Sequence, residues 1–191
     1  MKLLIGLGNP GEKYKNNRHN AGARCAQFLI SNWLRAPSEL QFLNKFQILI
    51  SQSFMNDSGK FVKEILTANR YSLTALYVAH DDLDIPLGKY KIQFGVGPKV
   101  HNGVKSVEEA LGTGEFWRVR IGIDNRNARM QEGKNARMAG EEYVLQDFTK
   151  EELEILERVF GEIAKDLHKS TNVQHPITNE WPSFKWSIFK I

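Results

Sequence analysis

The feature that most constrains the fold is a short apolar run near the N-terminus that ends in glycines. Leu3-Leu4-Ile5 leads directly into Gly6-Leu7-Gly8-Asn9-Pro10-Gly11, and a helical pattern of apolar residues begins at about residue 20. A buried run of this length predicts a strand, and glycine permits the turn and close backbone approach that follow it. The stretch Arg18-His19-Asn20-Ala21-Gly22 places a histidine between turn and helix. This order predicts the start of an α/β domain.

Short apolar runs alternate with amphipathic segments along the rest of the chain. The expected strands are 3–5, 46–50, 76–79, 89–94 and 117–123. The expected helices are 20–35, a segment after Asn56 and Ser58, a segment after His101-Asn102-Gly103, and one from the capping box Thr149-Lys150-Glu151-Glu152. This alternation predicts a single three-layer α/β domain over residues 1–191, with helices on both faces of a mixed, mostly parallel sheet. We expect an antiparallel strand near Lys89, a mobile loop at 124–139 and an atypical aromatic tail at 170–191.

Composition excludes several classes of protein. No run of about 18 apolar residues is present, so we expect no membrane span, and the broken apolar run at the N-terminus is no signal peptide. Cys25 is the only cysteine, which excludes an intrachain disulfide and favours a cytoplasmic location. Its helical spacing with Ala21, Phe28 and Leu29 predicts a core position rather than a nucleophile.

Charge is concentrated in one part of the chain. The net charge is +4, and the stretch from Lys89 to Arg137 carries ten basic and five acidic side chains. A basic block of this kind suits a polyanion such as nucleic acid, and it is equally compatible with a solvated basic face.

Several polar residues follow the expected strands. His19 lies beyond the first strand, Asn56 beyond the second, and Asp81 at the end of the third. If these strands are parallel, the three residues share the carboxyl edge of the sheet, where open α/β sheets bind ligands. Asn9 joins them from the first turn, and His101 and Asn102 can reach the same edge from the long loop.

Two rival kinds of site fit the sequence poorly. Gly6 to Gly11 matches the dinucleotide motif G-x-G-x-x-G, but Pro10 has no N–H for a phosphate and the helical pattern starts well beyond the glycines. No acidic residue for a ribose lies about twenty residues on, near Phe28 to Ser31. The run His80-Asp81-Asp82-Leu83-Asp84 offers hard ligands, yet its spacing matches no compact metal loop, so we predict no metal.

A third interpretation is general-base hydrolysis, although His19 taken alone fits a loop or helix-capping histidine better. A neutral imidazole can take a proton from water at neutral pH, and a carboxylate such as Asp81 would orient the ring of His19. Asparagine side chains can donate hydrogen bonds to a developing oxyanion. No G-x-S-x-G motif occurs, which favours water over serine as the nucleophile.

The sequence resembles the bacterial-type peptidyl-tRNA hydrolase family. The shared blocks run in family order over roughly residues 1 to 168: Gly6 to Gly11, Tyr14, Arg18 to Gly22, Phe54-Met55-Asn56, Ser58-Gly59, Ala79 to Asp84, His101-Asn102-Gly103 and Arg118 to Ile123. The resemblance implies hydrolysis of the ester between a peptide and the terminal ribose of tRNA, with no cofactor, by a cytoplasmic monomer.

The resemblance also implies a role for each site residue. His19 would be the base that activates water, Asp81 its orienting partner and Asn9 a catalytic amide. The implied substrate-binding residues are Tyr14, Phe54, Asn56, His101, Asn102 and Arg120, the last at a position linked to the tRNA 5′-phosphate. Peptidyl-tRNA is the implied partner, with no membrane and no metal.

Some positions depart from the family pattern. Gln93 stands where a lysine would share the 5′-phosphate with Arg120, and Gly97-Pro98-Lys99-Val100 replaces a glycine-rich loop. The segment between Ala36 and Phe46 is about a dozen residues shorter than is usual in the family. These departures motivate an alternative function, a non-catalytic RNA-binding relative of the splicing-factor branch.

Overall fold

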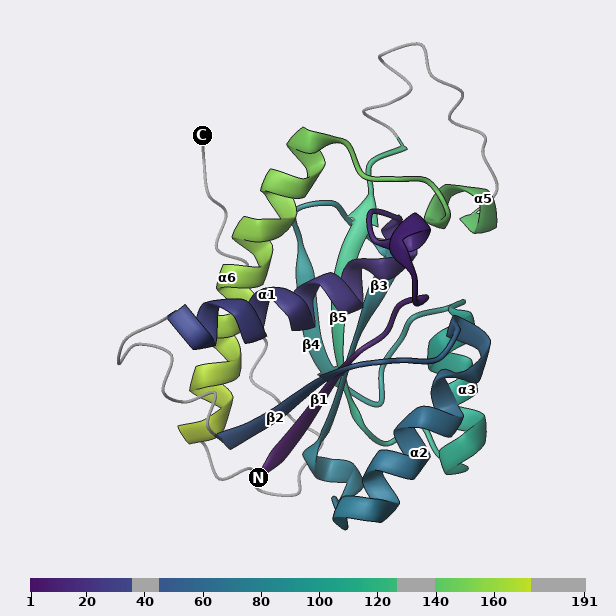
Figure 1. Cartoon of the computed structure of the whole chain (residues 1–191), viewed down its shortest axis with the longest axis vertical. Helices are drawn as coiled ribbons and strands as arrows, with labels where there is room; N and C mark the ends of the chain where they lie inside the picture. Colours follow the sequence, from purple (N-terminus) through teal and green to yellow (C-terminus); the bar gives the residue numbers. More distant parts are fainter. Residues whose placement is uncertain (36–44, 127–139, 173–191) are drawn as a thin grey trace.

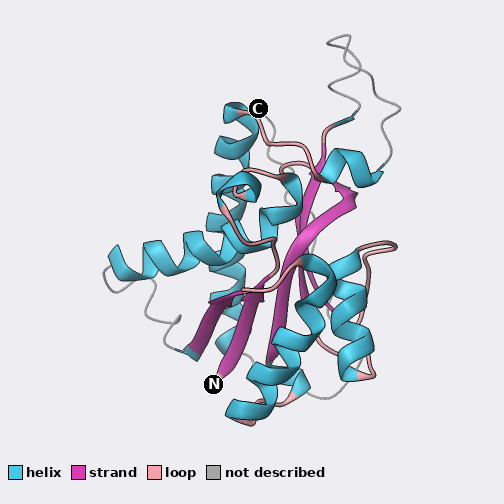
Figure 2. Cartoon of the chain, turned by 45° about the vertical axis from the view of Figure 1, so that its right-hand side comes forward, coloured by secondary structure: helices cyan, strands magenta, loops and turns pink. Residues whose placement is uncertain are grey.

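The computed structural model describes residues 1–35, 45–126 and 140–172 of the 191-residue chain. These residues form a five-stranded sheet between two layers of helix (Figure 1, Figure 2). The strands are β1 (Lys2–Gly6), β2 (Phe46–Ile50), β3 (Leu76–Pro86), β4 (Tyr90–Phe94) and β5 (Trp117–Asp124). The α-helices are α1 (Ala21–Arg35), α2 (Ser58–Asn69), α3 (Asn102–Leu111), α5 (Gly140–Val144) and α6 (Lys150–Asn172). Short 3-10 turns are η1 (Glu12–Tyr14), η2 (Arg18–Asn20), η4 (Met55–Asp57) and η5 (Leu73–Ala75).

The sheet is mixed and mostly parallel, as predicted. Its strand order is β2-β1-β3-β5-β4, with β1, β2, β3 and β5 parallel and β4 antiparallel to β5. Side chains alternate between the two faces, because successive residues of a strand point in opposite directions. Leu4 and Tyr77 pack toward α1 and α6, whereas Leu3 and Val78 pack toward α2 and α3. The three-layer α/β prediction is therefore confirmed for the described residues.

The N-terminal turn brings α1 close to the centre of the sheet. The backbone N–H of Leu7 donates to the carbonyl oxygen of Ala79 at 2.9 Å, and that of Ala23 donates to Leu7 at 2.8 Å. Gly22 allows this approach, since a Cβ at that position would overlap the same Ala79 carbonyl. The start of α1 and the residues before it consequently lie against the middle of β3.

Two expectations for the central strand and the following elements need correction. β3 runs to Pro86 rather than stopping near Ala79, because it continues to pair with β5 through an irregularity between Asp82 and Pro86. Asp81 thus lies inside the strand rather than at its end. Asp57 occupies the N-cap position of α2, in place of Asn56 or Ser58, and no side chain caps that helix. The capping box at Thr149 and Glu152 forms as predicted.

Other expectations have mixed outcomes. Cys25 is fully buried in the core, as its spacing predicts. Predictions for the short 36–46 segment, the 124–139 loop and the 170–191 tail fall largely outside the described residues. Among the residues that the structure describes, no helix combines the length and apolar character needed to cross a membrane.

Candidate active site

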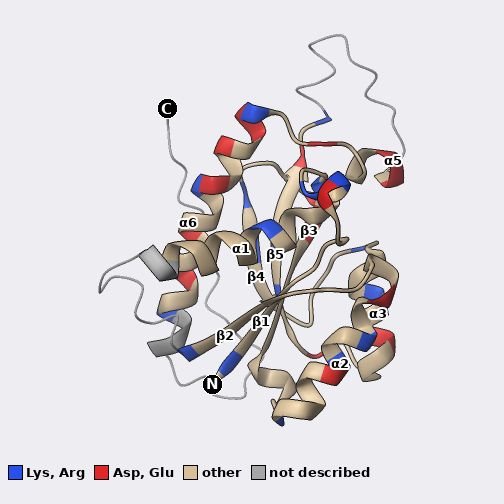
Figure 3. Cartoon of the chain, in the orientation of Figure 1, with Lys and Arg blue, Asp and Glu red and all other residues tan. Residues whose placement is uncertain are grey.

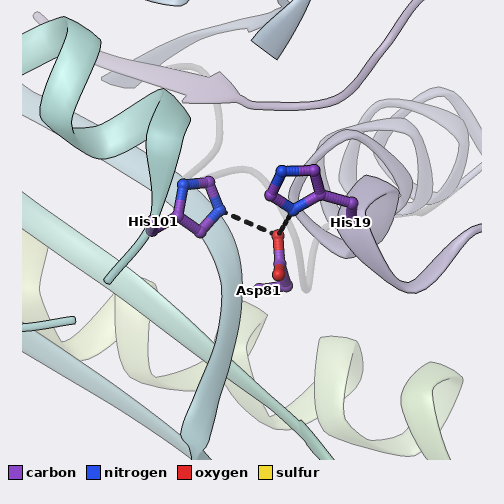
Figure 4. A group of neighbouring side chains, drawn as sticks. All are labelled: His19, Asp81 and His101. Atoms are coloured by element: carbon purple, nitrogen blue, oxygen red, sulfur yellow. Dashed lines mark hydrogen bonds and ion pairs between the residues drawn. The ribbon is translucent and has the colours of Figure 1, made fainter. Parts of the chain in front are cut away.

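His19, Asp81 and His101 meet at the carboxyl edge of the sheet. His19 is in η2, just before α1, Asp81 is in β3, and His101 directly precedes α3. Both histidines bond to the same carboxylate oxygen of Asp81, His19 through Nδ1 at 2.9 Å and His101 through Nε2 at 2.8 Å (Figure 4). All three side chains are buried. The order of strands predicted the meeting of His19 with Asp81, and the structure brings them together.

The hydrogen bonds define which ring nitrogen carries the proton. Nδ1 of His101 accepts from the backbone N–H of Val104 at 3.2 Å, so Nε2 carries the proton and donates it to Asp81. Nδ1–H of His19 donates to the same carboxylate oxygen. Nε2 of His19 then carries the lone pair that can accept a proton, so it is the basic atom of the group. The arrangement suits proton abstraction by His19.

Electrostatics keep Asp81 ionised. Burial acts to raise the pKa of Asp81, but His101 and His19 outweigh it and hold that pKa well below its usual range. Burial lowers the pKa of His19, yet the charge and hydrogen bond of Asp81 outweigh burial, so the pKa of His19 lies above 6.5. The ionised carboxylate therefore stabilises the imidazolium that forms when His19 accepts a proton.

A third histidine supports the group without joining it. His80 is fully buried, and its Nδ1–H donates to the backbone oxygen of Asp81 at 2.6 Å. Burial first, and His101 second, lower the pKa of His80 to about 3, so the ring is neutral at neutral pH. Its ring packs edge-on against His101, with centroids 5.0 Å apart. His80 thus adds no charge beside Asp81.

The segment that carries His19 is fastened on its other side to the start of α6. The Arg18 guanidinium is fully buried and bonds to Glu152 at 2.6 Å. It lies over the rings of Tyr143 and Phe148, 4.5 and 4.8 Å from their centroids. The Arg18 N–H also donates to the carbonyl of Gln146. Removing one partner of such a buried ion pair costs about 3–5 kcal/mol, so this contact secures the position of η2.

The side chain of Asn9 is held in a defined orientation. Its side-chain oxygen accepts the backbone N–H of Met55 at 2.8 Å. This bond leaves the Nδ2 group of Asn9 as its remaining side-chain donor. An amide donor held in this way can stabilise an oxyanion.

Four of the six residues expected to bind substrate lie on the surface or at its edge. Tyr14 and Phe54 pack edge to face with centroids 6.3 Å apart, and Phe54 is 54% exposed. Asn56 and Asn102 are exposed, the latter as the first residue of α3. His101 is buried and its side chain bonds to Asp81, and its expected part in substrate binding stays a prediction.

Arg120 lies in an internal network rather than on the open surface. Its Nε donates to Asp82 at 2.7 Å and its Nη1 to Gln93 at 2.8 Å, and the residue is 7% exposed. Arg118 is buried too and bonds to Glu108 and to the carbonyl of Gly97. The basic excess counted from the sequence consequently overstates the charge available to a polyanion. Both signs of charge also alternate along α2, α3 and α6 (Figure 3).

The histidines and Asp81 are also possible metal ligands, with ligand atoms within 4.8 Å of one another. A metal ion needs a lone pair from each imidazole. Both nitrogens of His101 are already engaged, Nδ1 with Val104 and Nε2 as the donor to Asp81. These contacts suit a proton-bearing group better than a metal site. The absence of a metal stays a prediction.

The chain is therefore an open α/β protein with a histidine bonded to a carboxylate at the carboxyl edge of its sheet. Such a pair suits general-base chemistry. The model of the family described as "Peptidyl-tRNA hydrolase" matches residues 3–185, and the chain belongs to this family. The resemblance found in the sequence is thereby confirmed.

Individual relatives agree with this membership. A peptidyl-tRNA hydrolase of Desulfitobacterium hafniense is 36% identical over 173 residues, which cover 83% of this chain and 86% of the relative. One from Dehalococcoides mccartyi is 38% identical, covering 87% and 91%. The crystal structure of the Acinetobacter baumannii peptidyl-tRNA hydrolase superposes with a TM-score of 0.67 at 25% identity, covering 90% of each chain.

Proposed function

We propose that this chain hydrolyses peptidyl-tRNA at the ester that joins the peptide to the terminal ribose of tRNA. Family membership supports the substrate. The observation that carries the chemistry is the single oxygen of Asp81 that accepts from both His19 and His101. The Asp81 carboxylate is held by both histidines, and it keeps the imidazole of His19 in the tautomer whose Nε2 can accept a proton.

The proposed reaction uses water and the residues of one chain. Nε2 of His19 takes a proton from water while the water oxygen attacks the ester carbonyl carbon. The Asn9 Nδ2–H donates to the oxyanion that forms, and Asp81 stabilises the imidazolium without becoming protonated. The intermediate then collapses, the ribose oxygen leaves and takes the proton from His19. The products are the free peptide acid and the tRNA hydroxyl.

The remaining predicted residues fit substrate binding around this centre. We assign Tyr14 and Phe54 to apolar contact with the substrate, and Asn56 and Asn102 to its polar groups, because all four lie at or near the surface. Nε and Nη1 of Arg120 already bond to Asp82 and Gln93, and its role with a 5′-phosphate stays a prediction. A monomer fits the proposal, since one chain supplies His19, Asp81 and His101, and a cytoplasmic location stays a prediction.

Release of peptide from purified peptidyl-tRNA tests the proposal directly. We expect multiple turnovers per chain, measured by separating free tRNA from peptidyl-tRNA. A chain that binds peptidyl-tRNA but leaves the ester intact would instead be the non-catalytic RNA-binding relative.

The pH dependence of kcat/KM follows from the raised pKa of His19. The base must be neutral in the free enzyme, and Asp81 favours its protonated form. Because the protonated form persists to higher pH, kcat/KM should rise with pH with a midpoint above 6.5. Initial rates measured between about pH 5 and 8 would show this rise of kcat/KM with pH. A midpoint below 6.5, or a flat profile, would contradict a base paired with Asp81.

A further inference from the structure

Asn20 binds the backbone of Asn9 with both ends of its side-chain amide. Its Nδ2 donates to the carbonyl oxygen of Asn9, and its Oδ1 accepts the N–H of Asn9, each at 2.9 Å. The residue is 5% exposed. A paired contact of this kind fixes both the position and the direction of the Asn9 peptide groups, because each bond restricts rotation about the other.

Two further contacts complete the support of Asn9. Its side-chain oxygen accepts from Met55 N–H, so backbone and side chain are held separately, by Asn20 and by the turn before α2. Gly8 leaves room for the Asn20 amide, since a Cβ at position 8 would lie 3.0 Å from the Asn20 Cγ. Asn9 Nδ2, the proposed donor to the oxyanion, therefore projects from a rigid support.

Asn20 is also the residue next to His19 in η2. The base and the support of the amide donor consequently belong to one short turn, which is held by the bond from Asn20 N–H to the Asn17 carbonyl at 3.0 Å. Any shift of this turn moves both groups together, so their mutual distance is preserved.

We propose that Asn20 is a positioning residue: it sets the Asn9 amide relative to His19 without touching the substrate. This inference rests on the proposed function and assigns a role to a residue that the sequence motif contains but leaves unexplained. Misplacing a reacting group by about 1 Å costs on the order of 10²-fold in rate. Loss of the Asn20 amide should therefore appear in kcat more than in KM.

The test is a double-mutant cycle with Asn20→Ala, Asn9→Ala and the double variant. We expect Asn20→Ala to lower kcat by about 10- to 100-fold with KM changed less than about threefold, and with the pH midpoint of His19 unmoved. If Asn20 acts through Asn9, the double variant should be no slower than Asn9→Ala alone. Additive losses, or an unchanged kcat in Asn20→Ala, would overturn the role.

Asn17→Ala is the matched control. Asn17 is another buried asparagine, and its side-chain amide bonds to Leu145 and Asp147 at 2.9 and 2.7 Å instead of to Asn9. We expect it to lose stability but to keep the wild-type kcat. If Asn17→Ala lost as much kcat as Asn20→Ala, general loosening of the turn would explain both losses, and the proposal would be overturned.

A near-isosteric variant covers the case in which Asn20→Ala does not fold. Asn20→Asp keeps the acceptor for Asn9 N–H but sets a carboxylate oxygen against the Asn9 carbonyl. Its kcat on the alkaline plateau should fall, and a wild-type value would refute the role. A wild-type chain that releases no peptide overturns the proposed function, whereas an active wild type with an additive cycle overturns only the role of Asn20.

Discussion

Replacing His19 by alanine is expected to lower kcat by about 10²- to 10⁴-fold, the range that a positioned general base contributes. The reason is that Nε2 of His19 is the basic atom left by the hydrogen bonds to Asp81. The substitution removes the proton acceptor while leaving the substrate-binding residues in place. KM for peptidyl-tRNA should therefore change little, and the far-UV circular dichroism spectrum should be that of the wild type.

His168→Ala is the control for this substitution. His168 is exposed on α6, far along the sequence from the group at Asp81. We expect wild-type turnover from that variant. Turnover within threefold of the wild type in a folded His19→Ala protein would show that another group activates water.

The second large effect is expected from Asp81→Asn, with a loss of kcat on the order of 10³–10⁴, as for the equivalent change in a Ser-His-Asp triad. An amide at position 81 can donate its N–H to Nδ1 of His19 and so favour the tautomer with the proton on Nε2. That tautomer cannot accept a proton from water at Nε2. His101 loses its charged acceptor in the same variant, so the group is disturbed from both sides.

Asp81→Asn also tests the effect of the Asp81 charge on the pKa of His19, because asparagine has nearly the same shape as aspartate but no charge. Asp81 raises the pKa of His19, so its replacement by a neutral amide should move the acid limb of kcat/KM to lower pH. Asp84→Asn is the matched control, because Asp84 belongs to the same acidic run but is exposed and pairs with Lys99. Residual activity with an unshifted acid limb in Asp81→Asn would contradict the assigned partnership.

Strand order was enough to predict that His19 and Asp81 meet. His19 and Asp81 follow short apolar runs, and parallel strands bring such positions to one edge. The prediction that the helix starts well beyond the glycines is confirmed, since η1 and η2 stand between the glycines and α1. In the structure, Gly22 allows α1 to approach the sheet at Ala79.

Contacts that depend on loop paths and side-chain reach could not be predicted. His101 was expected to reach this edge from the long loop, but no periodicity shows that its side chain shares an oxygen of Asp81 with His19. The pairing of Arg120 with Asp82 depends on the register of β3 and β5, which one sequence does not reveal. The position of Asn20 next to His19 was the one sequence feature that marked it, whereas its bond to Asn9 could be found only in the structure.

The ion pair between Arg18 and Glu152 has a consequence for the newly made chain. The two residues are separated by 134 positions, and the segment that carries His19 is fastened by this contact. The chain is synthesised from its N-terminus, so Asp81 and His101 are made while Arg18 still lacks its buried anion. The catalytic turn thus acquires its last support only once the start of α6 has left the ribosome. A chain truncated before that helix keeps His19, Asp81 and His101 but loses the ion pair that secures the position of η2.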